Sequence, residues 1–304
     1  MIKSITVTNH LDESIKLELM FPERSGFVVQ NIDGLGPAKA SINSKEVSTG
    51  DGGVFNSSRL TSRNIVLDLV YLMAPTIEAS RKRSYRYFPI KRRINFLIET
   101  DRGLFETYGY IESNEPNIFS SESGTRISIV CPDPYFYSAG LEGITVTPFS
   151  GIEPMFEFPF ENDDLNLKML QMGELQIDTI KTVYYKGDEE IGIKIYVDML
   201  GPVTNLSIFN MVTRESMIID SSKLVTLTGE GLHFGDTIII STVRSDKYIL
   251  LFRDGLYTNI LNCLDKYTDW FELSEGDNTL AYTADVGIEN LQFRIENQTL
   301  HEGV

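Results

Sequence analysis

The chain has 304 residues with 27 basic and 43 acidic side chains, which gives a formal net charge of −16. Single hydrophobic cores stop growing at about 250–300 residues, so this length predicts two domains. A hydrophobic content of 42% is ample for folded cores and excludes extended disorder as the main state of the chain. The apolar runs are far shorter than the ~20 residues of a membrane helix, and residues 1–20 hold no secretory core, so neither membrane insertion nor export is expected.

The charge is distributed unevenly along the chain. Residues 1–140 carry 16 basic and 16 acidic side chains, which leaves 11 basic and 27 acidic side chains for residues 141–304. An acidic second half is a poor candidate for binding nucleic acid, because neutralising phosphates requires clustered lysine and arginine. Cys131 and Cys263 cannot form a disulfide framework or a zinc knuckle, which favours a reducing compartment.

Alternating apolar residues predict strands in the first half of the chain. They are expected at 15–19, 65–69, 94–98 and 127–129. One helix is predicted over 76–88. Thr76 can act as its N-cap, Glu78 lies in its first turn, and Pro89 ends the helical stretch.

Prolines and glycines crowd residues 132–160, where neither a helix nor a central strand can propagate far. We therefore expect an N-terminal domain over 1–140, an aromatic and proline-rich connector over 141–160, and a C-terminal domain over 161–304. Aromatic residues are too frequent here for a flexible tether and predict packing along one or both domains. They are Tyr135, Phe136, Tyr137, Phe149, Phe156, Phe158 and Phe160.

The second half is predicted to be all-β, because short runs of alternating, β-branched or aromatic residues follow one another between turn residues. The turns include Asp254-Gly255 and Gly276-Asp277. Strands are expected at 191–197, 224–228, 237–243, 248–252, 279–283 and 291–295. No amphipathic helix is evident in this half, so the pattern favours an antiparallel sandwich or jelly roll over alternating strands and helices.

Residue patterns that carry chemistry are scarce. His10, His233 and His301 are scattered without metal-ligand spacing. The glycine-rich stretches 34–37 and 50–53 fit turns and match neither a phosphate loop nor a dinucleotide motif. Cys131 and Cys263 lack the sequence context of a nucleophile and are expected to be buried as small hydrophobic residues. We therefore expect no catalytic residue, metal or cofactor.

Two alternatives from other functional classes remain open. Acidic pairs, such as Asp163 with Asp164 and Asp265 with Asp269, could serve a jelly-roll glycoside hydrolase, although 27 acids in this half produce such pairs by chance. Trp270 could stack on a sugar in a monomeric carbohydrate-binding β-sandwich. Its neighbours fit a strand edge with aromatic residues in the core more simply.

Seven cations lie within residues 81–93, with no acid among them: Arg81, Lys82, Arg83, Arg86, Lys91, Arg92 and Arg93. They could be a solvated helix end, a contact with acidic groups of another subunit, or the lining of a channel for DNA. Strand alternation is expected to send Lys91 and Arg93 to one face and Arg92 to the other, so the cluster cannot share one partner. The interface candidates are Arg81, Arg83, Arg86, Lys91, Arg92 and Arg93.

A series of short motifs resembles one known family in order and spacing. In the first half these are Phe27-Val-Val, the stretch 32–37, Asp51-Gly-Gly-Val-Phe, Ser57-Ser-Arg, the stretch 63–67, Arg81, Tyr87, Phe88-Pro-Ile-Lys, Gly109-Tyr-Ile-Glu, Pro116, Ile118-Phe-Ser and the stretch 127–135. Near the other end they are Trp270, Leu273, Gly276, Asn278, Tyr282, Gly287 and Gly303-Val304. Together they resemble the distal tail protein (Dit) family of long-tailed bacteriophages.

The resemblance implies a mainly β chain and a structural role. The N-terminal, β-rich domain with one helix would form a hexameric ring at the tail tip, and a galectin-like antiparallel β-sandwich would project outward from it. Such a ring joins the major tail tube protein to the tail-tip hub or tail-associated lysin of the baseplate, with a receptor-binding protein as an optional further partner. DNA would pass through the ring without specific binding. The expected location is the virion tail tip, assembled in the bacterial host cytoplasm.

Overall fold

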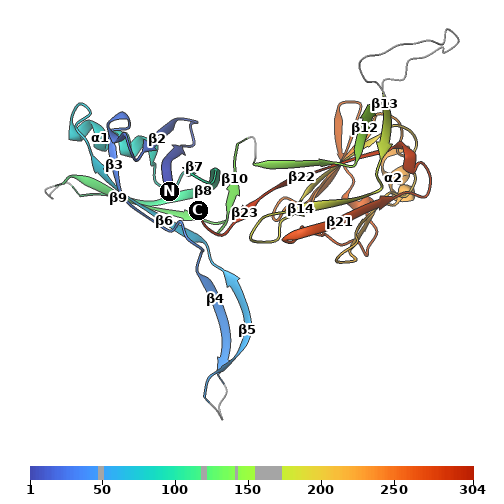
Figure 1. The fold of residues 1–304 in the computed structure, drawn as a ribbon, viewed down its shortest axis with the longest axis horizontal. Helices are drawn as coiled ribbons and strands as arrows, with labels where there is room; N and C mark the ends of the chain where they lie inside the picture. Colours follow the sequence, from blue (N-terminus) through green and yellow to red (C-terminus); the bar gives the residue numbers. More distant parts are fainter. Residues whose placement is uncertain (47–50, 118–121, 141–142, 155–172) are drawn as a thin grey trace, which may run out of the picture. The chain divides into compact units, whose positions relative to one another are not determined.

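The computed structural model describes residues 1–46, 51–117, 122–140, 143–154 and 173–304 (Figure 1). The chain is mainly β, as predicted, and its sheets are antiparallel. It divides into two compact units: unit 1 comprises residues 1–144 and 299–304, and unit 2 comprises residues 145–298. Among the described residues, no helix has the length and apolar character needed to cross a membrane.

Unit 1 is built on one sheet with the strand order β2-β1-β7-β8-β9-β6-β3. Its strands are β1 (Ile2–Thr8), β2 (Ser14–Glu18), β3 (Phe27–Asp33), β6 (Arg63–Tyr71), β7 (Arg93–Thr100), β8 (Leu104–Asn117) and β9 (Gly124–Cys131). The short strand β10 (Phe136–Ser138) pairs with β8 on one side and with β23 (Leu300–His301) on the other. The four strands predicted in this half are therefore confirmed as β2, β6, β7 and β9.

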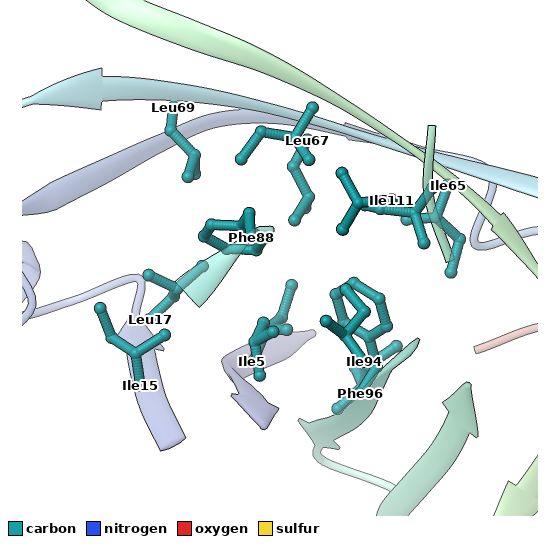
Figure 2. Packing of buried hydrophobic residues seen from close by; sticks show 14 of the residues in the cluster. Ile5, Ile15, Leu17, Ile65, Leu67, Leu69, Phe88, Ile94, Phe96 and Ile111 are labelled. Atoms are coloured by element: carbon teal, nitrogen blue, oxygen red, sulfur yellow. The ribbon is translucent and has the colours of Figure 1, made fainter. Parts of the chain in front are cut away.

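The sheet of unit 1 curls around a single hydrophobic core. Inward side chains of β1, β2 and β7 face those of β6 and of β8, as Figure 2 shows for Ile5, Leu17, Phe96, Leu67 and Ile111. Its two outer strands, β2 and β3, both contact the short 3-10 helix η1 (Pro22–Arg24). Alternation along each strand thus buries one face of the sheet and leaves the other in solvent.

The predicted helix is confirmed as α1 (Ile77–Tyr87). The side chain of Thr76 caps it by accepting a hydrogen bond from the Ala79 amide at 3.1 Å. Its buried face carries Ser80 and Ser84 instead of large apolar residues, and the Ser80 hydroxyl donates to the Leu72 carbonyl at 2.7 Å. Phe88, directly after the helix, is fully buried in the core.

Two further strands of unit 1 form a separate two-stranded ribbon, β4 (Ala40–Glu46) paired with β5 (Gly53–Leu60). Figure 1 shows this ribbon leaving the sheet and extending away from α1. At its base, Gly34 has φ +88°, and a Cβ at that position would lie 2.0 Å from the Asn64 carbonyl oxygen. Only glycine fits there, which explains the turn predicted at 34–37.

Unit 2 contains two larger antiparallel sheets that pack face to face. Tyr282 of one sheet stacks on Phe293 of the other with ring centroids 3.8 Å apart, and Phe149 packs beside both rings. The first sheet has the order β11 (Ile144–Pro148), β22 (Leu291–Gln298), β15 (Lys194–Met199), β18 (Thr237–Ser241), β19 (Tyr248–Arg253) and β20 (Leu256–Asn259). The second has the order β14 (Ile180–Tyr185), β21 (Gly276–Thr283), β16 (Ser207–Asn210) and β17 (Ser216–Ile218), and a small pair joins β12 (Ser150–Pro154) to β13 (Gly173–Ile177).

The strand predicted at 224–228 is wrong, because these residues belong to a helix, α2 (Ser221–Thr228). Asp220 caps α2 by accepting hydrogen bonds from the amides of Ser222 and Lys223, and Gly229 ends it in the left-handed conformation. Only Leu224 of this helix is buried. The cap and the terminal glycine decide the local structure here, and they outweigh the strand preference of Val225 and the threonines.

The boundaries of the two units lie at other residues than the predicted domain boundaries. Residues 144–148 and 150–154, placed in the connector, form strands β11 and β12, while residues 141–142 and 155–160 lie outside the described residues. The segment 299–304, predicted as part of the C-terminal domain, returns to unit 1. There β23 pairs with β10, and the Val304 amide donates to the Leu35 carbonyl at 2.9 Å.

Arg63, at the start of β6, is the buried centre of this junction. Its Nε donates to the Pro134 carbonyl at 2.8 Å and its Nη1 to the Gly34 carbonyl at 2.7 Å. Two further bonds reach the carbonyls of Gly36 and Glu302, and the guanidinium lies 4.3 Å from the ring centroid of Phe136. Burial lowers the pKa of Arg63, so the carbonyl oxygens stabilise a charge that has left water.

We predict that Arg63→Met destabilises unit 1 by about 3–5 kcal/mol, because the carbonyl oxygens that accept hydrogen bonds from the guanidinium all lose their donor at once. Arg63→Lys should cost nearly as much, since one ammonium cannot match the fork of a guanidinium. The loss in the free energy of unfolding is measured by urea titration, with hydrogen exchange of the unit 1 amides as the probe. A loss below about 1 kcal/mol, the net value of an ordinary hydrogen bond, would show that Arg63 does not hold the junction.

Candidate functional site

The cations predicted as interface candidates lie on α1, on the turn that leads to β7 and, for Arg93, at the first residue of β7. Arg81 forms an ion pair with Glu78 one turn earlier on α1. Arg86 forms a two-pronged ion pair with Glu13, its Nε lying 2.7 Å from Oε2 of the carboxylate. Both arginines therefore have partners within their own chain.

The partner of Arg86 is itself held in place by the loop after β1. Asn9 accepts hydrogen bonds from the amides of Leu11 and Glu13, and its own amide group donates to the Arg86 carbonyl at 3.1 Å. The hydrogen bonds from Arg86 lower the pKa of Glu13 to about 2. This arrangement fastens the end of α1 to the β1–β2 turn.

Two other cations of the cluster lie over aromatic rings. The guanidinium of Arg83 is 5.9 Å from the ring centroid of Phe27, and that of Arg93 is 4.4 Å from the ring centroid of Tyr108. Arg83 also fills the space beside Gly26, where a Cβ would come within 3.2 Å of its Nη1. Packing of this kind stabilises a guanidinium without a carboxylate.

The remaining cations, Lys82, Lys91 and Arg92, are exposed, and within the described ranges they form no ion pair. Lys91 has φ +64°, and β7 begins only at Arg93. Strand alternation therefore does not extend to Lys91 and Arg92, and the opposite faces predicted for these residues do not apply. Four of the seven cations, Arg81, Arg83, Arg86 and Arg93, have contacts within unit 1, and these three cations stay available to another molecule.

The structure reveals a second exposed surface, the β4–β5 ribbon, that motif-based reasoning missed. Every described side chain from 39 to 45 and from 51 to 59 is exposed. Three of them are large and apolar: Ile42 is 67% exposed, Val54 61% and Phe55 63%. The motif 51–55 marks this region, but no residue type in it predicts that both faces of the strands lie in solvent.

The pairing register sorts these side chains between the two faces of the ribbon. Ile42 pairs with Ser58 and Ser44 with Phe55, and a bulge between residues 43 and 44 adjusts the register. Since side chains alternate along a strand, Ile42 and Phe55 share one face. Lys45 and its partner Val54 lie on the other face.

A third surface follows the end of β2. Leu19, Met20 and Phe21 are consecutive and 41%, 83% and 49% exposed. The guanidinium of Arg24 covers the Phe21 ring from 4.8 Å and is also paired with Glu18 at 2.9 Å. Such a run of apolar side chains on the surface is typical of an interaction site.

Residues considered for catalysis are not brought together. His10 is exposed in unit 1, His301 contacts Ser138 through its Nε2 at 2.9 Å, and His233 lies in unit 2. Asp265 accepts a hydrogen bond from the Tyr267 amide in a turn, and the pair 163–164 lies outside the described residues. Within the described ranges, no group of three or more histidine, cysteine or acidic side chains could hold a metal ion.

The two cysteines and Trp270 lie in surroundings that serve the fold. Cys131 and Cys263 are buried as predicted, and burial raises the pKa of the Cys131 thiol to about 11, far from that of a nucleophile. Trp270 is half-buried outside any strand, with Lys247 5.5 Å from its ring centroid, so its predicted place at a strand edge is wrong. The neighbouring Phe271 is the aromatic residue that enters the core.

Solved structures of phage tail proteins share this β-rich fold over nearly the whole chain. The crystal structure of the SPP1 Dit protein matches with a TM-score of 0.66 at 12% identity and covers 97% of this chain and 99% of that one. Chains of the phage p2 baseplate in its activated conformation, solved with Sr and with Ca, each match with a TM-score of 0.51 at 12% identity. They cover 97% and 98% of this chain, and 98% and 99% of the p2 chains.

The fold is thus that of phage tail-tip proteins, and more particularly that of the distal tail protein Dit. No protein-family model and no curated protein matches the sequence. The structural likeness confirms, at the level of the fold, the resemblance that the sequence motifs carry.

We predict that the Glu13–Arg86 pair makes the stability of unit 1 depend on acid pH. The folded-state pKa of Glu13, about 2, lies below the ordinary value of 4.5, so its contribution is complete above pH 4.5 and is lost as the pH falls toward 2. Glu13→Gln should flatten the dependence of the urea midpoint on pH in this window. Arg86→Gln should remove most of this dependence, because only the smaller effects of Asn9 and His10 then still lower the pKa of Glu13. The double variant should behave like Glu13→Gln alone. Additive effects would mean that the two side chains act independently.

Proposed function

We propose that the chain is a structural component of the tail tip of a phage, prophage or tailocin, where it forms a hexameric ring that joins the tail tube to the baseplate hub. The observation that carries this proposal is the fold shared with the SPP1 Dit protein over 97% of this chain. That protein is described as a paradigm of the hub adsorption apparatus in phages that infect Gram-positive bacteria.

Each unit has a separate part in this proposal. Unit 1 forms the ring, because its balanced charge permits copies to pack side by side, whereas the acidic second half makes unit 2 suited to an outer position. Unit 2 is then the galectin-like sandwich. The partners are other copies of the chain, the major tail tube protein, the tail-tip hub or tail-associated lysin, and a receptor-binding protein. DNA passes through the ring, and the assembled particle, put together in the host cytoplasm, carries the protein at the virion tail tip.

The experiment that tests this function is light scattering of the purified full-length chain, followed by negative-stain microscopy. The proposal expects a mass of six chains and ring-shaped particles with sixfold symmetry, formed alone or with the tail tube protein. A monomer under both conditions contradicts it. If that monomer gave a specific signal on a glycan array, the carbohydrate-binding alternative would be favoured.

We predict that Lys82→Glu combined with Arg92→Glu weakens docking to the tail tube protein without unfolding unit 1. Both cations are exposed, and reversing their charge turns attraction for acidic groups into repulsion. The matched control is Arg81→Glu with Arg83→Glu, which reverses two cations that have contacts within the chain. This control should lower the melting temperature of unit 1, unlike the Lys82 and Arg92 variant. Co-sedimentation at low and moderate salt gives the readout. Unchanged docking would show that the cations are simply a solvated helix end.

A further inference from the structure

Three loops of unit 2 meet at one end of its two sheets. They span residues 200–206, 230–236 and 284–290. Backbone hydrogen bonds join them: the Val203 amide donates to the Leu232 carbonyl at 3.3 Å, and the Thr204 amide donates to the Val286 carbonyl at 3.1 Å. We call this region the loop end of unit 2.

The loop end lies at the start of β22. Leu291, the first residue of that strand, pairs with Met199 just before the first of the three loops. Gln298, the last residue of the same strand, precedes the segment that returns to unit 1. Figure 1 shows α2, which leads into the loop 230–236, at the loop end. The chain therefore leaves unit 2 from the other end of β22.

Large apolar side chains are exposed at the loop end. Their exposed fractions run from 41% for Leu200 to 73% for Phe234. The group comprises Leu200, Val225, Phe234, Leu256 and Val286. Apolar side chains gathered in this way on a surface are typical of an interaction site.

Backbone contacts place Leu200 beside Phe234. The Gly235 amide donates to the Met199 carbonyl at 3.0 Å, and the Met199 amide donates to the Asp236 carbonyl at 2.9 Å. Leu200 directly follows Met199, and Phe234 directly precedes Gly235. The first two loops therefore present their apolar side chains side by side.

Gly231 connects α2 and the β19–β20 hairpin to the same end. A Cβ at Gly231 would lie 4.0 Å from Cγ2 of Val225, and the Gly231 carbonyl accepts a hydrogen bond from Nη2 of Arg253 at 2.7 Å. Arg253 pairs with Leu256 across the hairpin. Val225 and Leu256 thus lie close to the loop that carries Phe234.

The turn that carries Phe234 is held by a buried ion pair. The carboxylate of Asp236, which is 1% exposed, accepts hydrogen bonds from the His233 amide at 2.9 Å and from Nε of Arg253 at 2.8 Å. Nη2 of Arg253 donates to the same carboxylate at 2.6 Å. An apolar side chain presented on a fixed backbone loses less entropy on binding, so Phe234 is suited to insert into a pocket of a partner.

Exposed acids lie next to these apolar residues along the loops and the hairpin. They are Glu230, Asp254, Asp285 and Glu289. Asp285 accepts a hydrogen bond from the side-chain amide of Asn205 at 2.7 Å. In the described part of unit 2, Asp254 and Glu289 form no ion pair. The rim of the apolar surface is therefore acidic.

The basic groups at the loop end already have partners. Arg253 pairs with the buried carboxylate of Asp236, and Nζ of Lys223 donates to a backbone carbonyl at 2.7 Å. The His233 ring lies 3.5 Å from the carboxylate of Glu230. These contacts leave the acids of the rim to attract basic groups from outside the unit.

We propose that the loop end of unit 2 docks a different protein, one that presents apolar side chains flanked by lysine or arginine. The apolar side chains of that protein pack on Phe234, Leu200 and Leu256, and its cations face the acids of the rim. The contact does not depend on the ring of the proposed function, because every residue in it belongs to unit 2.

Charge disfavours two other occupants. The loop end of a second copy would set acids against acids, which costs binding energy. A surface of anionic lipid would repel the same acids. A different protein with a basic rim meets both the apolar and the acidic parts of the surface.

A short fluorescein-labelled peptide, with leucines flanked by lysines, probes the site on the purified full-length chain by fluorescence anisotropy. We expect saturable binding that weakens as salt is raised. Two control peptides, one with serine in place of leucine and one with glutamate in place of lysine, should not bind. Hydrogen exchange should show protection of the loops 200–206, 230–236 and 284–290 by the leucine–lysine peptide.

Variants separate the apolar contact from general attraction to an acidic chain. Phe234→Ser with Leu256→Ser should weaken peptide binding at least tenfold, or about 1.4 kcal/mol, with an unchanged melting temperature because both side chains are exposed. The matched control is Ile180→Ser with Tyr184→Ser, two exposed residues of β14, and it should bind normally.

A second pair of variants tests the acidic rim. Asp254→Asn with Glu289→Gln should weaken binding at low salt and reduce its dependence on salt. Glu275→Gln with Asp277→Asn removes two exposed acids near the start of β21, the opposite end of that strand from the loop 284–290, and should leave binding unchanged.

Several results would overturn the proposal. These are a leucine–lysine peptide that does not bind, and binding that persists in the Phe234 and Leu256 variant or falls equally in the β14 control. A drop in oligomeric mass of the Phe234 and Leu256 variant, measured by light scattering, would identify another copy of the chain as the occupant. Sedimentation with phosphatidylcholine vesicles that this variant abolishes would identify a lipid surface instead.

Discussion

The structure of unit 1 depends on one buried guanidinium. Arg63 binds carbonyl groups from three stretches that are distant in sequence: the turn 34–36, the loop at Pro134 and the returning segment at Glu302. Because a buried cation needs all its donors satisfied, these stretches must be in place together. One side chain therefore fixes both the base of the exposed ribbon and the place where the chain returns to unit 1.

This junction makes unit 2 an insertion in the sequence of unit 1. The first segment of unit 1 runs to Ile144 and includes β10, and the second segment begins with Thr299, whose carbonyl accepts a hydrogen bond from the Ser138 amide. Unit 1 is complete only when both segments are present, so a chain that ends near Gly140 lacks part of its sheet and the acceptor of Arg63 at Glu302. Ring formation by unit 1 would then require synthesis of the whole of unit 2.

The sequence predicts the β-rich class, the helix of unit 1 and most of the strands, because alternation and the Thr76 cap are local signals. It does not predict α2, whose cap at Asp220 is a weaker signal than the β-branched residues that follow it. The return of residues 299–304 is set by a contact with Arg63, over 200 positions away, which leaves no periodic pattern. The cation cluster is visible in the sequence, but only the fold shows that Arg86 pairs with Glu13 and that Arg83 lies over the Phe27 ring. The exposure of the β4–β5 ribbon is likewise a property of the fold.

The central claim is the proposal that copies of this chain assemble into a closed ring through unit 1. A cryo-electron microscopy reconstruction of the assembled full-length chain tests it most directly. The account predicts a closed sixfold ring built from unit 1, with Arg63 still bound to the Glu302 carbonyl of its own chain. An assembly without closed symmetry, or a ring in which unit 1 makes no contact between copies, would contradict it.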